Sequence, residues 1–517
     1  MKLKRQQRLI SDGAFARMMQ SAIDLWRRCD FQQCTEIMER ASRMEPANSG
    51  ILLDLGVAYG KMQDYASAER CLEQSVRVSP NKTEALKAAG VRCLHFEKHD
   101  LAERFFQRAI EQNNASPDTF VHLAEIYERR HRFDDSAQYV ERALRLDRSN
   151  GAAMLVQARL ERQRGHFSEA EQILRSIPAT AGKEILVPKY YELGGILDRQ
   201  KRFDEAMAAF QEAKTIMQAT AAPHAAELKI IRGRLRLLKE SLTSEIFQSW
   251  FDYGKQFQPR HRLALLAGNP RSGTTLLEQV LDSHPEIVSA EETDIFHNVA
   301  YMPLLRRLPD ETPLISALES APKQVLQQSR EAYFRSIGLF HGEPVGNRLL
   351  VDKNPSLSYL IPALARIFPE AKLLIALRDP RDVCMSCYMQ SLTAGQVSTA
   401  YLTLADTVDE YTALMGTWLT IKPMIRSTYL EVKYEDMVEN LEGTARRTLE
   451  FLGMPWDADV LRFDEHARNK LVRSPTYADV AKPVFKTAVG RWRNYQKYLE
   501  PHLEKLAPFV KAFGYDE

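Results

Sequence analysis

LAGNPRSGTT, residues 266–275, is the stretch that decides how the second half of the chain is interpreted. It has the outline of a nucleotide-binding phosphate loop, GxxxxGK[ST], from Gly268 to Gly273, but Thr274 stands where that motif needs lysine and Arg271 comes earlier. An apolar run precedes the loop and a helical pattern follows it, which is the strand–loop–helix context of an anion site. The missing lysine argues against ATP or GTP hydrolysis, because that lysine neutralises the transferring phosphate.

The sequence around this loop has the alternating strand and helix pattern of an α/β domain. Short apolar runs bounded by turn residues alternate with helical patterns; the runs are RLALLAG (262–268), EIVSAEE (286–292), RLLVDKNP (348–355), KLLIALRDP (372–380) and TYLEVKYEDM (428–437). Strands that alternate with helices predict βαβ units and a parallel sheet.

The first half of the chain repeats every 34 residues. Small residues return at that interval in two parallel series, which are Cys34, Ala68, Ala102, Ser136 and Ala170, and, seven residues later, Ala41, Ser75, Ala109, Ala143 and then Ile177. A further unit carries Ala206 and Ala213 with a small slip. Two antiparallel helices approach closely only where small side chains meet, whereas a generic helical bundle has no reason to keep a 34-residue register. The region resembles tetratricopeptide repeats, which implies an α-solenoid of about six units between residues 15 and 215 that docks a peptide or protein.

The predicted fold class is therefore α plus α/β. Residues 1–235 form an α-solenoid of tetratricopeptide repeats with a helical connector, and residues 236–517 form a P-loop-like α/β domain with a parallel sheet.

Composition narrows the class of protein. The 517 residues carry a net charge of +2, which gives no overall reason to bind nucleic acid or an anionic membrane. No apolar run reaches the roughly 18 residues of a membrane span, and the basic N-terminus lacks the apolar core of a signal peptide. The six cysteines are scattered, and Cys384 and Cys387 are interpreted as ordinary helix-facing thiols. We expect a cytoplasmic protein.

A second motif follows about 105 residues after the loop. IALRDPRDVCMSCY places Arg378 at the end of an apolar run and Ser386 eight residues later, and Asp379 and Pro380 are residues typical of a helix start. With the loop, this pair resembles the sulfotransferase family, which transfers a sulfuryl group from 3′-phosphoadenosine 5′-phosphosulfate (PAPS). The resemblance implies that Arg378 and Ser386 hold the donor's 3′-phosphate.

The same resemblance assigns the loop itself. It implies that Arg271 contacts the bridging and sulfuryl oxygens, and that the 5′-phosphate is held by Ser272, Gly273, Thr274 and Thr275. No metal is required, because a sulfuryl group carries less charge than a phosphoryl group.

A third match lies near the C-terminus, in KPVFKTAVGRWRNYQKYLEP (482–501). In the family such a basic segment closes over the donor, which implies that Arg491 reaches the 3′-phosphate with Trp492 beside it; a solvated amphipathic helix is the alternative. Tyr434 in VKYEDM and Thr476 in RSPTY align with donor-contacting positions, although YEDM also suits a strand end with helix-capping acids.

Sulfuryl transfer needs a base that activates the acceptor. EET at 291–293 resembles the protein-tyrosine sulfotransferase branch and implies that Glu292 is this base, with Glu291, His284 and His297 as the other candidates. Asp294 replaces the arginine that this branch uses for acceptor recognition. Lys353 in VDKNPS matches a lysine that the branch uses to stabilise the leaving oxygen.

The sequence thus predicts a PAPS-dependent sulfotransferase with a hydroxyl acceptor on a protein, peptide or carbohydrate, while lipid-linked sugars and small alcohols stay open. Two other classes remain as alternatives: a P-loop-type nucleotide kinase or NTPase, and a non-catalytic repeat scaffold with a vestigial nucleotide-binding domain.

Overall fold

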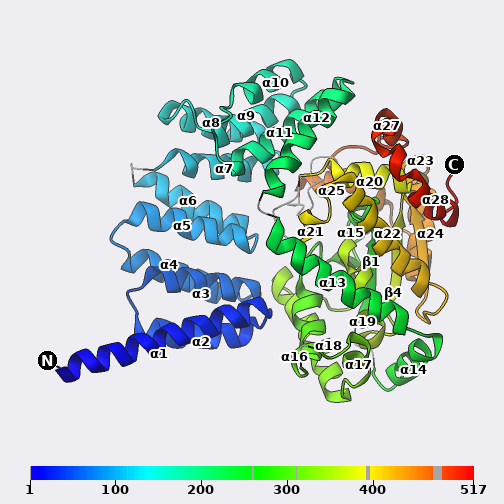
Figure 1. Ribbon diagram of the computed structural model, residues 1–517, viewed down its shortest axis with the longest axis horizontal. Coiled ribbons are helices and arrows are strands. Elements are labelled where there is room, and N and C mark those ends of the chain that lie inside the picture. The colour runs from blue at the N-terminus through cyan, green and yellow to red at the C-terminus, as the bar shows by residue number, and fades with distance from the viewer. Residues whose placement is uncertain are drawn as a thin grey trace.

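The computed structural model describes residues 2–112, 115–219, 221–258, 261–309, 311–391, 396–469 and 480–516. A helical array occupies the first half of the chain, and an α/β domain lies beside it (Figure 1). The predicted fold class is confirmed. Within the described part of the chain, no helix combines the length and apolar character that crossing a membrane would require.

Over the described residues from 2 to 218, the array consists of six antiparallel helix pairs. They are α1 (Lys2–Arg27) with α2 (Phe31–Met44), α3 (Ser49–Lys61) with α4 (Tyr65–Val78), α5 (Lys82–His95) with α6 (His99–Glu111), α7 (Pro117–Arg129) with α8 (Phe133–Leu146), α9 (Gly151–Gln163) with α10 (Phe167–Ser176), and α11 (Lys183–Arg199) with α12 (Phe203–Gln218). The second helices begin 34 residues apart from Phe31 to Phe167, and the last begins 36 residues later, which is the predicted slip.

Close packing within each pair explains the repeated small residues. Both predicted series are buried throughout, and Ala206 and Ala213 of the last pair are buried as well. Glycines extend the same rule: a Cβ on Gly90 would lie 2.5 Å from the Phe106 ring, and one on Gly194 would lie 2.6 Å from Phe210. The repeat register is therefore a packing requirement.

The turn within each pair has one conformation in all six units. One residue there adopts a left-handed backbone, and these residues are Cys29 (φ 54°), Gln63 (64°), Glu97 (59°), His131 (57°), Gly165 (85°) and Lys201 (61°). Both ends of this row of turns meet the α/β domain: Arg306 donates to the carbonyl oxygen of Cys29 (2.6 Å), and Lys201 lines a cavity shared with that domain.

The α/β domain is built on a five-stranded parallel sheet with the order β2-β3-β1-β4-β5. The strands are β1 (Arg262–Gly268), β2 (Ile287–Ser289), β3 (Leu349–Lys353), β4 (Lys372–Leu377) and β5 (Tyr429–Lys433), and each lies in a run that predicted it. Because β1 lies between β3 and β4, the residues that follow these three strands meet at one edge, where ligands bind in open parallel sheets.

Helices cover both faces of the sheet. One face packs against α15 (Thr274–Asp282), α23 (Tyr434–Glu439), α24 (Leu441–Leu452) and α25 (Phe463–Asn469). The other packs against α18 (Lys323–His341), α19 (Ile361–Ile367), α20 (Pro380–Tyr388) and α22 (Leu404–Ile421). The core of this second face continues into α11 and α12 of the array, so the two halves share packed side chains.

Shorter elements complete the domain. They are α14 (Ser244–Gly254), η1 (Phe296–Tyr301), α16 (Met302–Arg306), α17 (Leu314–Glu319), η2 (Pro355–Leu360), α21 (Gln396–Thr399), η3 (Ala458–Arg462), η4 (Arg491–Tyr495), α27 (Gln496–Leu499), η5 (Glu500–His502) and α28 (Leu503–Ala512).

The predicted connector is helical and lies on the α/β domain. Its helix α13 (Ala222–Ser241) crosses the α/β domain (Figure 1) and contacts α17, α21 and α22. Arg232 of α13 forms an ion pair with Glu410 of α22 (2.6 Å). The predicted boundary at 235/236 falls inside this helix and stays a prediction.

Candidate active site

The phosphate-type loop forms a tight turn between β1 and α15. Gly268, Arg271 and Gly273 have φ values of 147°, 72° and 93°. A Cβ on Gly268 would lie 2.5 Å from the carbonyl oxygen of Ala376, and one on Gly273 would lie 2.8 Å from the Tyr434 ring. Two glycines are therefore required by conformation and by space.

The loop presents the start of α15 to an anion. Gly273 is the N-cap residue, and glycine has no side chain that could cap the helix. The amide end of α15, with the positive end of its helix dipole, lies at the loop, which suits a phosphate group. Ser358 fixes the start of the turn, because its hydroxyl accepts from the Gly268 amide (3.0 Å) and donates to the Gly268 carbonyl (2.7 Å).

The two predicted anchors meet in space. Arg271 donates from Nε to the Ser386 hydroxyl (2.9 Å), and Arg378 donates from Nη1 to the carbonyl oxygen of Arg271 (3.2 Å). The three side chains line one cavity of about 990 Å³, together with Gly273, Thr274, Thr275 and Tyr434. Ser272 is buried behind it. The loop and the second motif therefore face the same space.

Arg378 keeps unused donor capacity at this cavity. Its guanidinium lies over the Tyr434 ring, 4.9 Å from the centroid, and Nη2 donates to the carbonyl oxygen of Ala488 (2.5 Å). Its buried Nε finds no hydrogen-bond acceptor among the described residues.

The C-terminal segment closes one side of the cavity. Asp382 of α20 accepts from the amides of Gly490 (2.6 Å) and Trp492 (2.8 Å), which ties the segment to the helix after β4. Arg491 lines the cavity, and its guanidinium forms an ion pair with Asp198 of α11 (2.6 Å). The Trp492 indole lies against Arg381, at 4.5 Å, and is not among the described residues that line the cavity.

A carboxylate–ammonium–carboxylate group lies at the ends of β2 and β3. Lys353 Nζ is 2.6 Å from Glu292 Oε1 and 3.0 Å from Glu278 Oε2. The Glu292 side chain is 33% exposed and lines the cavity, whereas Lys353 and Glu278 are 1% exposed and lie behind it. Burial lowers the pKa of Lys353, but the two carboxylates outweigh burial and raise it above its usual range. Lys353 is thus a buried cation that orients the Glu292 side chain.

Comparison with known proteins identifies this architecture. The sulfotransferase family model matches residues 264–458, which include the loop, Glu292, Lys353, Arg378 and Ser386. Residues 264–458 therefore form a sulfotransferase domain. Tetratricopeptide-repeat models match residues 22–117, 129–187 and 190–217, so the array consists of tetratricopeptide repeats.

Individual relatives match parts of the chain. An uncharacterized protein of Aquifex aeolicus is 25% identical over 69% of this chain and 46% of its own length. Protein-tyrosine sulfotransferase 1 of Danio rerio is 28% identical over 49% of this chain and 72% of its own length. Among solved structures, the sulfotransferase domain from the Synechococcus PCC 7002 olefin synthase is 20% identical, covers 50% of this chain and 96% of its own, and has a TM-score of 0.36. The chain thus spans about half the length of the first of these relatives.

The other base candidates, His284, His297 and Glu291, are not among the described residues that line the cavity. His284 is buried, contacts the Pro455 carbonyl oxygen through Nε2 (3.0 Å) and accepts from the Glu286 amide (3.1 Å), so it stabilises a turn. His297 contacts Asn298 (3.0 Å), and Glu291 is buried. Thr476 lies outside the described residues.

Three carboxylates that shape the site were not predicted for these roles. Glu278 pairs with Lys353, and Asp382 accepts hydrogen bonds from the C-terminal segment. Asp198, which lies in the repeat array, forms an ion pair with Arg491. Glu278 carried a signal, because it is a lone acid in the apolar run LLEQVL. Asp198 carried none, since its partner is almost 300 residues away in the sequence.

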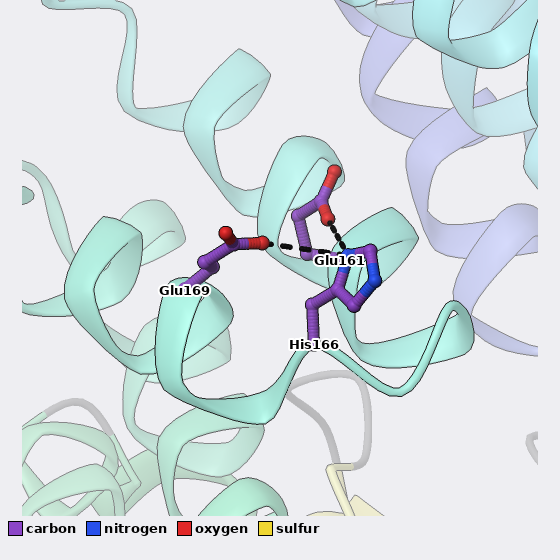
Figure 2. A group of neighbouring side chains, drawn as sticks. All are labelled: Glu161, His166 and Glu169. Carbon is purple, nitrogen blue, oxygen red and sulfur yellow. Dashed lines mark hydrogen bonds and ion pairs between the residues drawn. The ribbon is translucent and has the colours of Figure 1, made fainter.

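Two further groups of polar or sulfur-containing side chains lie outside the lining of the cavity. Cys384 and Cys387 are buried free thiols, and Cys387 lies 3.2 Å from the Pro270 carbonyl oxygen beneath the loop. Glu161, His166 and Glu169 gather at the turn between α9 and α10 (Figure 2). His166 Nδ1 is 2.7 Å from Glu161, which Arg164 also binds (2.8 Å), so this is an exposed ion-pair cluster.

Proposed function

We propose that this protein transfers a sulfuryl group from PAPS to a hydroxyl group of a protein or peptide acceptor. The observation that carries the proposal is that the loop with Arg271 and the pair Arg378–Ser386 face one cavity. A donor with a phosphosulfate at one end and a 3′-phosphate at the other needs two anion sites in a single space.

The residues at the cavity fit this donor. The amide end of α15 suits the 5′-phosphate, with Gly273, Thr274 and Thr275 at the cavity as its site, while a contact of the buried Ser272 with the donor stays a prediction from the sequence. Arg378 and Ser386 suit the 3′-phosphate, and the buried Nε of Arg378 has a donor to spare. Tyr434 and Arg491 border the same space, and Thr476 stays a prediction from the sequence.

The chemistry that the protein supplies follows from the arrangement. Glu292 accepts the proton of the attacking hydroxyl, because it is the carboxylate of the acidic group that reaches the cavity surface. Arg271 stabilises negative charge on the bridging oxygen as the donor leaves. Lys353 acts on the reaction by holding Glu292 in place and by its positive charge beneath the site.

A polypeptide acceptor is supported by two observations. Several relatives that match half of this chain are named protein-tyrosine sulfotransferases. Tetratricopeptide repeats, which are protein-interaction modules, lie directly beside the cavity. A carbohydrate hydroxyl is the second candidate, because Asp294 departs from the tyrosine-sulfating pattern. The cytoplasmic location stays a prediction.

The two alternative functions, a nucleotide kinase or NTPase and a non-catalytic scaffold, predict different residues at the site. A nucleotide kinase or NTPase would need a lysine at position 274, where the chain has threonine. A vestigial scaffold would have lost its anchors, whereas Arg271, Lys353, Arg378 and Ser386 all line or support one cavity.

The test is to incubate the protein with sulfur-35-labelled PAPS and a lysate from its own source, with Glu292→Gln as the matched inactive control. We expect label in the protein fraction with the wild type and not with the variant. Label in neither, under conditions in which the wild type is folded, would refute the proposed transfer; label only in carbohydrate would refute the polypeptide acceptor.

A further inference from the structure

One wall of the catalytic cavity belongs to the repeat array. The last two repeats contribute side chains from α9, α10, α11 and α12 and from the turn between α11 and α12; those used below are Phe167, Asp198, Arg199, Lys201 and Phe203. The repeat array therefore lines part of the space in which the proposed reaction takes place.

This wall is fixed to the sulfotransferase domain. Asp198 accepts from the Tyr495 hydroxyl (2.6 Å) in addition to its ion pair with Arg491. Asp204 pairs with Lys497 (2.8 Å) and accepts from the Tyr498 hydroxyl (3.0 Å). The Phe203 ring meets Tyr495 edge to face at 5.5 Å. These contacts keep the turn of the last repeat at the edge of the cavity.

Two cations on this wall are available to a ligand. Arg199 and Lys201 are exposed, line the cavity and have no acidic partner among the described residues. The neighbouring Arg202 contrasts with them, because it pairs with Glu171 (2.7 Å) and Glu205 (2.6 Å). The donor has no need of these cations, since its two anionic ends are matched by the helix amides with Arg271 and by Arg378.

We propose that the last repeat is the acceptor-recognition wall of the enzyme, and that Arg199 and Lys201 bind a carboxylate of a peptide acceptor beside its reacting hydroxyl. The aromatic rings of Phe167 and Phe203, both half-buried at the same wall, pack against apolar parts of that peptide. A peptide is favoured over a neutral sugar because a peptide can offer a carboxylate, whereas a neutral sugar has no negative charge to pair with the two cations. This inference rests on the proposed function.

The test measures peptide binding to the full-length protein saturated with 3′-phosphoadenosine 5′-phosphate. Two fluorescein-labelled peptides with a central tyrosine are compared by anisotropy, one flanked by glutamates and the other by glutamines. The variant is R199Q/K201Q, and the control K229Q/R236Q removes the same charge from exposed positions of α13 outside the cavity.

We expect the wild type to bind the glutamate peptide more tightly, and R199Q/K201Q to weaken that binding about fivefold, because two partly exposed ion pairs are lost. Its binding should also depend less on salt, while the control and the glutamine peptide are unaffected. Equal wild-type binding of both peptides, or equal loss in variant and control, overturns the inference.

Failure here is distinguishable from failure of the proposed function. Label transfer to the peptide and thermal stabilisation by 3′-phosphoadenosine 5′-phosphate report the reaction and the donor site independently. If both are present and R199Q/K201Q binds the glutamate peptide like the wild type, only the acceptor wall is wrong. If both are absent, the proposed function is wrong whatever the peptides do.

Discussion

Replacing Glu292 by glutamine separates the chemical step from binding. Glu292 Oε1 lies 2.6 Å from Lys353 Nζ, and glutamine keeps an oxygen for that contact while losing the ability to accept a proton. A positioned general base contributes roughly 10²- to 10⁴-fold. At 1.36 kcal/mol per tenfold, the barrier should rise by about 3–5 kcal/mol. We expect kcat to fall by roughly 10²- to 10⁴-fold and the affinity for the donor to stay unchanged.

Glu278→Gln is the matched control, because it removes the other carboxylate of the same ammonium. Glu278 is buried behind the cavity, 3.0 Å from Lys353, and cannot reach an acceptor. A hydrogen bond to a charged group contributes about 1.5–3 kcal/mol, so the free energy of unfolding should fall by about that amount. Lys353 keeps Glu292, and kcat should change by less than tenfold.

The assay is single-turnover transfer of labelled sulfate to a tyrosine peptide, with urea unfolding measured on each variant. Full activity in Glu292→Gln would refute the base assignment. A loss of activity in Glu278→Gln as large as that of Glu292→Gln, without loss of stability, would show that the two carboxylates have been assigned the wrong roles.

Three further predictions test the donor site and the buried charges. Arg378→Ala should weaken binding of 3′-phosphoadenosine 5′-phosphate about tenfold to a hundredfold by calorimetry, because a charge-assisted contact is lost; unchanged affinity would remove Arg378 from the donor site. Gly273→Ala introduces a Cβ 2.8 Å from the Tyr434 ring at a residue with φ 93°, so the free energy of unfolding measured in urea should fall by about 1–3 kcal/mol and donor binding should weaken. An unfolding free energy equal to that of the wild type would contradict the required conformation. Burial lowers the pKa of Lys214 from 10.5 to about 7, so the unfolded chain binds more protons than the folded protein between these pH values, and the free energy of unfolding should rise with pH across that range. Lys214→Met should remove this rise. A rise of the same size in the variant, measured by urea unfolding from pH 6 to 10, would refute the role of Lys214.

Much of the fold was predictable because packing leaves a periodic trace. Small residues must return wherever paired helices touch, and Ala206 marked even the slip before the last unit. The strands were predictable since each buried strand is a short apolar run bounded by turns. The loop was predictable because Gly268 and Gly273 are needed at fixed places in a strand–loop–helix turn.

The remaining parts of the site depend on contacts between distant segments. The resemblance assigned Lys353 to the leaving oxygen, but only the structure shows that Lys353 is buried between the carboxylates of Glu278 and Glu292. Arg491 was expected to reach the 3′-phosphate, and only the structure shows that the repeat array also supplies Asp198 as its partner. Residue type shows that a charge needs a partner but does not show which one the fold provides.

The most direct measurement of the central claim compares ligands by thermal melting of the wild-type protein. If one cavity holds both anion sites, 3′-phosphoadenosine 5′-phosphate should raise the melting temperature far more than adenosine 5′-phosphate, which lacks the 3′-phosphate, because stabilisation follows affinity for the folded state. ATP with Mg²⁺ should have little effect. Stabilisation by ATP–Mg²⁺ alone, or equal stabilisation with and without the 3′-phosphate, would contradict the shared donor cavity.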